Sequence, residues 1–560
     1  MAAPEFDVVI VGAGMAGALC AYKLSARTDL KILLLDAGEN LFDDAQRAEF
    51  VKVLAVASGK GVVWPYSKLP SVKSVPNPDP NPKDGKDVHL VEAGPDIFKS
   101  NYLRIVGGST WAWRGNVPRY IPSDFRLKSI YGVGEDWPLT YCDLEPYYCQ
   151  AEIELGVSGN HDEWQDLLGA HRSRPFPMPN IVQSYGDRLV KARLDGLTLD
   201  VKTVHVVSTP QARNSQPYDG RSACQGNANC IPVCPSGAKY DAGVHLRKAL
   251  ANGVQLKTRA VACRLQAESD GTVSTVIFKD WKDPDLKEQS VTAKTVVLAL
   301  HGIETPRLWL LSNLGNRSDQ VGRNLMDHLA EEVVGLFPEP IYPFRGPQNT
   351  SSIEDFRDGP FRAAHGAFRM SIGNDGWGRR GRPADEIEKL AWKPESKTLR
   401  KFGESLKYAI EDRITRMFRL SYSTEQLPSP DNRVTLDKAQ LDPLGIPRPK
   451  IAYAVDDYSK RALVYGQDIA RRLFRSIVGA EEIQPREPNL EYNGAGHIMG
   501  TCRMGTDPDT SVVDPFGRSH EHPNLFVLGS SVFVTGSTGN PTLTAAALTL
   551  RTTEVIQSTL

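Results

Sequence analysis

Several features that would place a protein in a simple class are missing from this chain of 560 residues. No apolar stretch is long enough to cross a bilayer and no internal repeat is present, so we predict neither a transmembrane segment nor a repeat architecture. The 66 basic and 67 acidic side chains nearly cancel, which argues against a nucleic-acid partner. Eight scattered cysteines are too few for a disulfide scaffold.

The N-terminal segment MAAPEFDVVIVGAG also lacks the basic region, apolar run and cleavage site of a signal peptide. We therefore expect no signal peptide of its own and a cytoplasmic location. The alternative is a periplasmic location, reached by export together with a partner that carries a signal.

A glycine-rich turn follows the first apolar run. The segment VIVGAGMAGALCAYKL places Gly12, Gly14 and Gly17 in the G-x-G-x-x-G spacing, and Asp36 ends the next apolar run. The glycines permit a tight turn, close approach of a pyrophosphate and close helix–strand packing, while the carboxylate can bind a ribose diol. We predict a dinucleotide site here. The alternative is a turn that only packs a helix on a strand, and the pattern alone does not separate NAD from FAD.

The order of elements predicts an α/β doubly wound sheet with a second domain. A strand over 6–11, a helix over 15–26 and a strand over 31–35 form a βαβ unit, and a further strand is predicted over 294–300. From 334 to 487, charged helical patterns alternate with strand-like pieces, which favours a separate α+β domain. The Pro- and Asp-rich segment 70–88 is predicted to be a surface excursion.

Several longer motifs resemble the glucose-methanol-choline (GMC) oxidoreductase family. They are YLRIVGGSTWAWRGNVPRYIPSDF (102–125), TVVLALHGIETPRLWLLS (295–312), VGRNLMDH (321–328), GHIMGTCRMGTDPDTSVVD (496–514) and NLFVLGSSVFVTGSTGNPTLTAAALTLR (524–551). The resemblance is greatest to the FAD subunits of bacterial glucose and fructose dehydrogenases and more distant to pyranose oxidases. It implies FAD and the oxidation of an alcohol carbon.

The resemblance also implies the fold and its division. We expect the GMC fold, with a Rossmann-like FAD-binding domain and a discontinuous α+β substrate-binding domain. The expected ranges are 1–48, 89–160, 188–333 and 488–560 for the FAD-binding domain, which includes a cysteine loop at 221–240, and 334–487 for the substrate-binding domain.

Two residues match the family's catalytic positions. His497 falls on the catalytic histidine and Asn540 on the second position, which is often His or Asn. A neutral imidazole is suited to remove a hydroxyl proton as hydride leaves for the flavin N5, and an amide can orient the substrate oxygen. The alternatives are a structural histidine and a turn formed by Asn540 with the following proline. We interpret His301 and His328 as structural or cofactor-lining.

Further cofactor contacts follow from the same resemblance. Gly107, Gly108 and Ser109 are expected to let the backbone approach the flavin, Val261 to bring a strand backbone to the adenine, and Gly529 to belong to the cofactor site.

The resemblance places three further positions near the flavin, two with alternative roles and one that bears on how FAD is attached. Trp111 and Trp113 are expected either to line the flavin or to pack in the core. Ala112 stands where related enzymes have a histidine, which in the oxidases can bond covalently to the flavin. We therefore predict non-covalent FAD.

The loop CQGNANCIPVCP contains Cys224, Cys230 and Cys234. The resemblance implies that these three thiolates hold a [3Fe-4S] cluster. Related dehydrogenases have two adjacent cysteines at the start of this loop, and Gln225 replaces the second one here, so the ligand set stays open. The alternatives are a free-thiol loop, a disulfide, or zinc with a fourth ligand that could be His245 or Cys263.

The expected substrate is therefore a sugar or glycoside hydroxyl, with electrons passed to an acceptor other than oxygen. A small subunit and a cytochrome or other acceptor are the expected partners. Three alternatives are an oxygen-using, pyranose-oxidase-like enzyme, an inactive flavin-binding electron-transfer subunit, and a sterol or aliphatic-alcohol oxidase.

Overall fold

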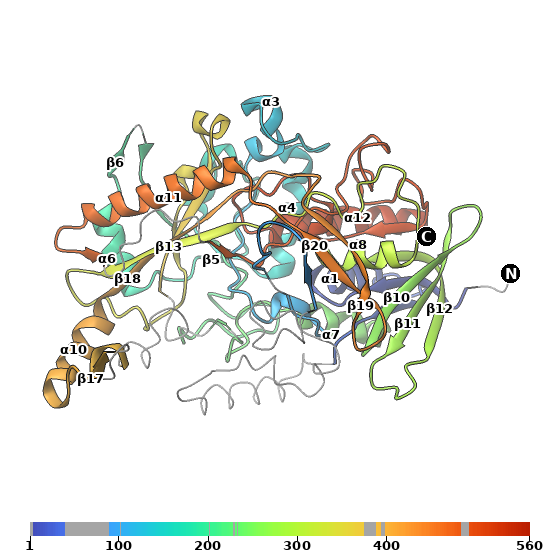
Figure 1. Ribbon diagram of the computed structural model, residues 1–560, viewed down its shortest axis with the longest axis horizontal. Helices are drawn as coiled ribbons and strands as arrows, with labels where there is room; N and C mark the ends of the chain where they lie inside the picture. The colour runs from blue at the N-terminus through green and yellow to red at the C-terminus, as the bar shows by residue number, and fades with distance from the viewer. Residues whose placement is uncertain are drawn as a thin grey trace.

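The computed structural model describes residues 4–39, 89–100, 102–200, 202–227, 230–231, 233–374, 388–393, 398–482 and 492–560. Two large sheets organise these residues. Figure 1 shows β1 and the C-terminus towards one end of the long axis, and the strands β13 and β18 towards the other. The predicted surface segment 70–88 lies outside the described residues.

The first sheet grows outwards from β1 (Phe6–Val11). Its parallel strands run in the order β23 (Leu525–Val527), β12 (Glu288–Leu298), β1, β2 (Ile32–Leu35) and β9 (Gln255–Lys257). β12 is long enough to have a third partner, because its first residues pair antiparallel with β11 (Val273–Asp280), which pairs in turn with β10 (Ala260–Ala267). The apolar runs of the sequence are thus the buried strands of a doubly wound sheet, as predicted.

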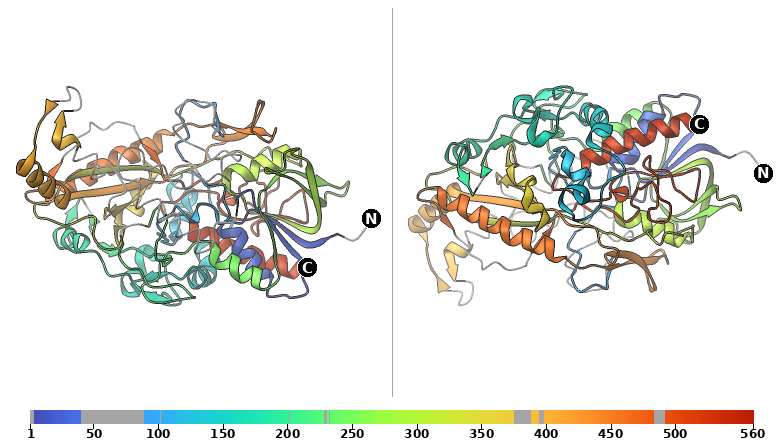
Figure 2. Two further views of the ribbon diagram at one scale, coloured as in Figure 1. Left: turned by 90° about the horizontal axis from the view of Figure 1, so that it is seen from below. Right: turned by 90° about the horizontal axis from the view of Figure 1, so that it is seen from above.

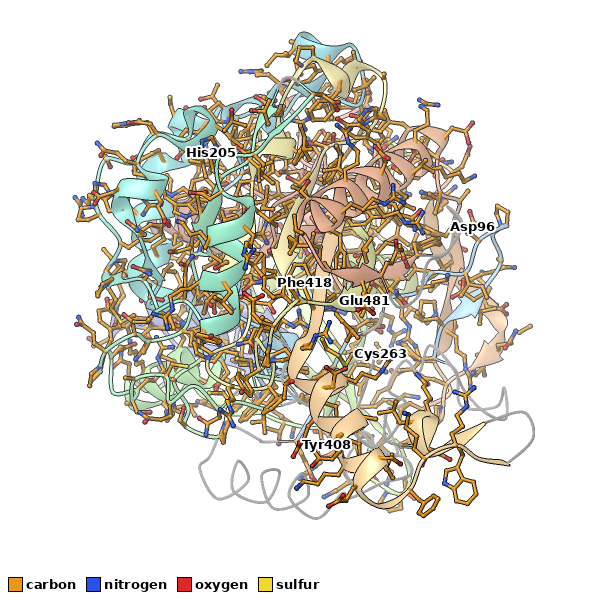
Figure 3. All side chains as sticks on the ribbon, turned by 90° about the vertical axis from the view of Figure 1, so that its left-hand side faces the viewer. Asp96, His205, Cys263, Tyr408, Phe418 and Glu481 are labelled. Atoms are coloured by element: carbon orange, nitrogen blue, oxygen red, sulfur yellow. The ribbon has the colours of Figure 1, made fainter. Side chains whose placement is uncertain are left out.

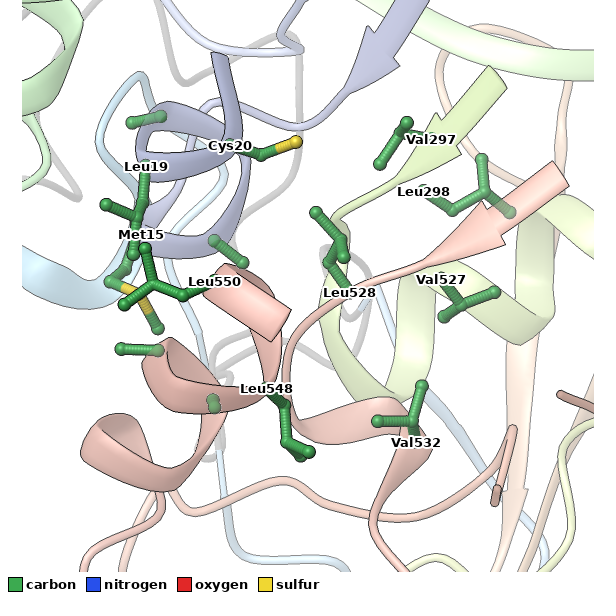
Figure 4. Packing of buried hydrophobic residues seen from close by; sticks show 14 of the residues in the cluster. Met15, Leu19, Cys20, Val297, Leu298, Val527, Leu528, Val532, Leu548 and Leu550 are labelled. Carbon is green, nitrogen blue, oxygen red and sulfur yellow. The ribbon is translucent and has the colours of Figure 1, made fainter. Parts of the chain in front are cut away.

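Helices bury one face of the glycine-turn unit. α1 (Met15–Leu24) packs against α7 (Gly243–Ala251) and α12 (Thr542–Thr559), and the three lie side by side in Figure 2. Met15 and Leu19 of α1 lie near Leu550 of α12 in the core shown in Figure 4. Cys20 is fully buried in this layer and packs there as a small apolar residue.

The second sheet is antiparallel throughout. Its order is β21 (Glu481–Glu482), β13 (Leu329–Leu336), β18 (Met417–Thr424), β15 (Phe368–Ile372), β14 (Ser351–Ile353) and β8 (Val206–Ser208), and β22 (Asn493–Gly494) also pairs with β13. α11 (Asp457–Ser476) covers β13 and β18. The α+β character predicted for 334–487 is confirmed, but the sheet also recruits β8 and most of β13 from outside that range.

The remaining elements connect and surround these two layers. α8 (His301–Leu311) follows β12, and α10 (Gly403–Arg416) carries Tyr408, which is exposed beyond the second sheet in Figure 3. A third sheet joins β19 (Arg433–Leu441), β20 (Pro447–Ala452) and β3 (Val91–Glu92). Further helices are α3 (Leu127–Tyr131), α4 (Tyr141–Leu155), α5 (His161–Trp164) and α6 (Tyr185–Leu194). Short strands also form pairs, which are β4 (Ser158–Gly159) with β5 (Met178–Pro179), β6 (Thr198–Leu199) with β7 (Lys202–Thr203), and β16 (Trp392–Lys393) with β17 (Thr398–Leu399).

Among the described residues, no helix has the length and apolar character needed to cross a membrane.

The contact of α11 with the second sheet gives a test of the packing. A methyl group added to Gly466 would lie 2.7 Å from the ring of Tyr422, whose hydroxyl is held by the carbonyl of Leu463. Gly→Ala inside a helix ordinarily stabilises by about 1 kcal/mol, but overpacking costs about 1–3 kcal/mol. We expect Gly466→Ala to lower the thermal unfolding midpoint, and Val464→Ala, at an exposed position of the same helix, to leave it nearly unchanged. An unchanged or higher midpoint for Gly466→Ala would contradict this packing.

Candidate active site

The turn between β1 and α1 has the shape that a pyrophosphate requires. A Cβ on Gly12 would lie 2.6 Å from the carbonyl oxygen of Ala299, and one on Gly17 would overlap the carbonyl oxygen of Gly12. A Cβ on Gly14, in contrast, would meet no atom of the described residues within 4 Å, and no side chain in the described ranges caps the start of α1. The first and third glycines are therefore required by packing, while the second leaves open space beside the positive end of a helix.

Asp36 lies next to this turn and is buried. Its carboxylate accepts hydrogen bonds of 2.7 Å from the main-chain N–H groups of Ala13 and Gly38, and burial raises its pKa. The main-chain N–H of Ala260 donates to the carbonyl of Asp36 at 2.8 Å, which brings the start of β10 alongside. Val261 follows there, is buried, and pairs with Lys279 in the β10–β11 ladder.

The other predicted cofactor residues gather at the same turn. The main-chain N–H of Gly107 donates to the carbonyl of Ala13 at 3.0 Å, and a Cβ on Gly108 would lie 3.4 Å from Cα of Gly14. A Cβ on Gly529 would lie 3.8 Å from Cβ of Ala16. Three distant segments thus meet around the start of α1, and this arrangement fits a dinucleotide.

The two tryptophans beyond this turn differ in their surroundings. Trp111 is buried in the core and donates through Nε1 to the carbonyl of Val106, which favours its packing interpretation. Trp113 is partly exposed and donates through Nε1 to the carbonyl of Tyr240. Ser109 is exposed.

The predicted catalytic pair forms one hydrogen-bonded chain with two residues that the sequence did not mark as functional. Nε2 of His497 lies 3.0 Å from the amide nitrogen of Asn540, and Nδ1 of His497 lies 2.8 Å from Nδ1 of His328. Nη1 of Arg369 donates to Oδ1 of Asn540 at 3.0 Å, and Nε2 of His328 lies 3.0 Å from the carbonyl oxygen of Gly536.

This pattern assigns the protons along the chain. Because the guanidinium of Arg369 can only donate, the oxygen of Asn540 faces it and the NH₂ group faces His497. Nε2 of His497 must then accept, so its proton is on Nδ1 and is donated to His328. His328 carries its own proton on Nε2 and donates it to Gly536. Both imidazoles are neutral in this arrangement.

The surroundings of His497 and His328 keep both imidazoles neutral. Burial, with additional effects of His328 and Arg369, lowers the pKa of His497 well below its ordinary value. Burial likewise lowers the pKa of His328 to about 4. Nε2 of His497 therefore carries no proton at neutral pH, and its lone pair accepts the hydrogen bond from the amide of Asn540.

Asp327 holds the loop that carries His497. This carboxylate is buried and accepts hydrogen bonds from the main-chain N–H groups of His328, Ala495 and His497 and from the hydroxyl of Ser100. Burial raises its pKa to about 6. A single side chain thereby fixes the backbone of both imidazole residues.

The second sheet supports the segment that carries Asn540. Glu354, next to β14, accepts from Nη2 of Arg369 at 2.6 Å and from Nη1 of Arg357 at 3.3 Å. Nε of Arg357 donates to Thr538 at 3.0 Å. Although burial opposes ionisation, the two guanidinium groups hold the pKa of Glu354 below its usual range. Two arginines that share one carboxylate therefore fix Thr538 and Asn540.

The pair is also tied to the dinucleotide turn. Ser530 donates through its hydroxyl to the carbonyl of Ile498 at 2.6 Å, and the neighbouring Gly529 approaches Ala16 of α1. His497 and the start of α1 are thus attached to the same short segment after β23.

One of the three loop cysteines contacts a buried guanidinium group, that of Arg213. The three cysteines form no disulfide, and Cys230 and Cys234 are buried. Nη1 of Arg213, a fully buried residue, lies 2.7 Å from the sulfur of Cys230, and its Nη2 donates to the carbonyl of Gln348. Among the described residues, no carboxylate forms an ion pair with Arg213.

No three His, Cys, Asp or Glu side chains within the described ranges converge as ligands of a single metal ion. His245, named above as a possible zinc ligand, instead contacts Tyr240 and Glu154. The zinc alternative therefore has no geometric support in the part of the chain that the structure describes.

Comparison with known proteins identifies the family. Residues 207–330 and 428–549 match GMC oxidoreductase, and residues 10–73 match an NAD(P)-binding Rossmann-like domain. The chain is 36% identical to the fructose dehydrogenase large subunit of Gluconobacter japonicus, over 98% of this chain and 97% of that protein. The chain belongs to the GMC oxidoreductase family.

Two further comparisons agree with this family. The 6'''-hydroxyparomomycin C oxidase of Streptomyces lividus is 30% identical over 99% of this chain and 91% of its own length. The crystal structure of pyridoxine 4-oxidase from Mesorbium loti superposes with a TM-score of 0.62 at 20% identity, covering 98% of this chain and 99% of that one, and supports the fold. This GMC protein is thus an oxidoreductase acting on CH–OH donors, and its family implies FAD.

The sequence motifs singled out His497 and Asn540 but did not predict that His328 and Arg369 would contact them. His328 was predicted to be structural or cofactor-lining, but it lies in hydrogen-bonding contact with His497. Arg369 had no motif that marked it. The only available signal was the histidine that ends VGRNLMDH, next to the aspartate that fixes the loop.

The glycine turn predicts opposite behaviour for two neighbouring substitutions. Gly14→Ala places a methyl group in open space with φ at −73°, so the thermal midpoint of FAD-free protein should be nearly unchanged while FAD affinity falls about tenfold or more. Gly17→Ala should destabilise even the FAD-free protein, by about 1–3 kcal/mol. Thermal unfolding and fluorescence titration with FAD measure the two effects. Wild-type FAD affinity in Gly14→Ala would place the pyrophosphate elsewhere.

Proposed function

We propose that this GMC oxidoreductase is a FAD-dependent dehydrogenase that oxidises a hydroxyl group of a sugar or glycoside. The observation that carries the proposal is the pairing of an accepting nitrogen, Nε2 of His497, with a donating amide, that of Asn540. Similarity to the fructose dehydrogenase large subunit over nearly the full length of both chains supports a carbohydrate substrate.

The pair suits an alcohol because a hydroxyl both donates and accepts. A substrate hydroxyl that enters between the two groups donates to Nε2 of His497 and accepts from the amide of Asn540. As the carbon is oxidised, its hydroxyl proton passes to Nε2 and the oxygen, now a carbonyl oxygen, keeps the hydrogen bond from Asn540. FAD, when bound, supplies the flavin ring that accepts the hydride from the same carbon.

The cofactor would be held without a covalent bond. The start of α1 with Gly12, Gly14 and Gly17 would receive the pyrophosphate, Asp36 the ribose, and the main chain at Val261 the adenine. Gly107, Gly108, Ser109 and Gly529 would lie along the remainder of the cofactor. Alanine at position 112 provides no atom that could bond to the flavin.

We further propose that Cys224, Cys230 and Cys234 hold a [3Fe-4S] cluster. A buried guanidinium without a carboxylate partner is costly unless another anion faces it. Arg213 is such a group, and the sulfur that it contacts belongs to this loop. A cluster bound by three thiolates would supply that negative charge, and it does not require side chains that converge on one ion.

Such a cluster would carry single electrons to an external acceptor, so oxygen would not be required. The name of the Gluconobacter japonicus relative, a large subunit, favours a companion small subunit for this chain too. A cytochrome or similar protein would then be the acceptor. The oxygen-using alternative draws support from the Streptomyces lividus oxidase. Reduced enzyme mixed with air, and separately with ferricyanide, decides between them. Fast peroxide formation would overturn the dehydrogenase proposal.

The lowered pKa of His497 predicts how the rate constant of flavin reduction changes as the pH falls. A base whose pKa lies well below 6.5 stays unprotonated as the pH falls through 6.5, so the rate constant of flavin reduction should stay level between about pH 8 and 6 and fall only at lower pH. Anaerobic stopped-flow mixing with fructose or glucose across this range is the measurement. A midpoint at or above pH 6.5 would show that His497 is not the base in this environment.

Substitution of His497 measures how much this residue contributes to the rate of flavin reduction. His497→Ala should lower the rate constant of flavin reduction by about 10²- to 10⁴-fold while FAD remains bound. His205→Ala changes an exposed histidine distant in sequence and should leave the rate constant unchanged. A His497→Ala variant that reduces its flavin at the wild-type rate would remove the catalytic assignment.

The cluster is tested by metal analysis. Anaerobically purified protein should contain about three irons per chain and show absorbance beyond the flavin bands. Cys230→Ser should lower the iron content below one per chain while FAD is retained, and Cys142→Ser, at an exposed cysteine outside the loop, should not. Flavin absorbance alone in the wild-type protein would exclude the cluster.

A further inference from the structure

His328 occupies a position in the site that the proposed reaction does not use. Its ring is fully buried, and both of its nitrogens are engaged, Nδ1 with His497 and Nε2 with the carbonyl of Gly536. It contacts neither of the two atoms between which the substrate hydroxyl would enter.

The hydrogen bonds form a closed circuit. Gly536 and Asn540 belong to one loop, and the path from Gly536 through His328 and His497 returns to that loop at Asn540. The carbonyl of Gly536 is itself held by the hydroxyl of Tyr120 at 2.6 Å. The orientation of His328 is therefore determined at its far nitrogen, and its near nitrogen can only accept.

An accepting neighbour matters because a neutral imidazole has two tautomers. The tautomer with the proton on Nε2 would point an N–H at the amide of Asn540, which also donates, and would leave no lone pair for a hydroxyl proton. An acceptor at Nδ1 removes this tautomer. In other enzymes with a histidine base, loss of the partner that fixes the tautomer costs up to about 10⁴-fold in rate.

We propose that His328 is a positioning residue that fixes the reactive tautomer of His497 by accepting the hydrogen bond from its Nδ1–H. The proposal rests on the proposed role of His497 as the base. It assigns a function to the last residue of the VGRNLMDH motif.

The test compares three variants. His328→Leu removes the acceptor, His328→Asn keeps an accepting oxygen near the position of Nδ1, and His365→Phe changes a histidine that stacks on Phe361, remote from the circuit. We expect His328→Leu to lower the rate constant of flavin reduction by about 10- to 1,000-fold, with the substrate dissociation constant within about threefold of wild type. His328→Asn should recover at least tenfold of that loss, and His365→Phe should behave as wild type.

FAD content and thermal midpoint show whether each variant is folded. If His328→Leu does not retain FAD, His328→Phe replaces it, since its ring fills the same space without an acceptor. A wild-type rate in the apolar variant, an asparagine variant as slow as the apolar one, or a loss confined to substrate affinity would each overturn the proposal. A wild-type rate in His497→Ala would instead overturn the proposed function.

Discussion

The hydrogen bond from the amide of Asn540 to Nε2 of His497 is the interaction around which this site is arranged. It joins the loop before α12 to the loop after β22, and it has a direction: the amide donates and the imidazole accepts. Every neighbouring contact is consistent with that direction. Arg369 turns the amide, Asp327 holds the backbone of His497, and His328 accepts on the far side. A neutral chain of this kind needs surroundings of low polarity, and the burial of Asp327, His328 and Arg369 beside the partly buried His497 and Asn540 contributes to them.

The charged groups lie one layer away from the neutral chain. Glu354, Arg357 and Arg369 are almost fully buried, and removing one partner of a buried ion pair typically costs about 3–5 kcal/mol. Because one carboxylate serves both arginines, the second sheet and the loop of the first domain cannot move independently at this point. The second sheet thus holds the amide of Asn540 in place through Arg369. The dinucleotide-binding domain contributes His497, the proposed base.

The sequence was informative where chemistry follows local spacing. Gly12, Gly14 and Gly17 required only a short segment to be interpreted, and His497 and Asn540 were identified because whole motifs surround them. The partners of these residues were not predictable in the same way. His328 and Arg369 are separated by 169 and 171 residues from the atoms that they contact, and β13 and β15 acquire their places only when the second sheet forms. For the same reason the sequence did not indicate that β8, which precedes the range 334–487, would pair with β14 in that sheet.

The buried ammonium group of Lys239 connects the cysteine loop to the segment that carries Trp111 and Trp113. Lys239 donates to the carbonyls of Trp111 and Trp113 at 2.7 and 2.6 Å and to the carbonyl of Cys230 at 2.9 Å. Three carbonyls around one ammonium group hold the two segments at a set separation, because each bond has little freedom in length. The position of the cysteine loop relative to the tryptophan segment therefore depends on Lys239. The same contact ties Trp113, which is only partly buried, to the cysteine loop.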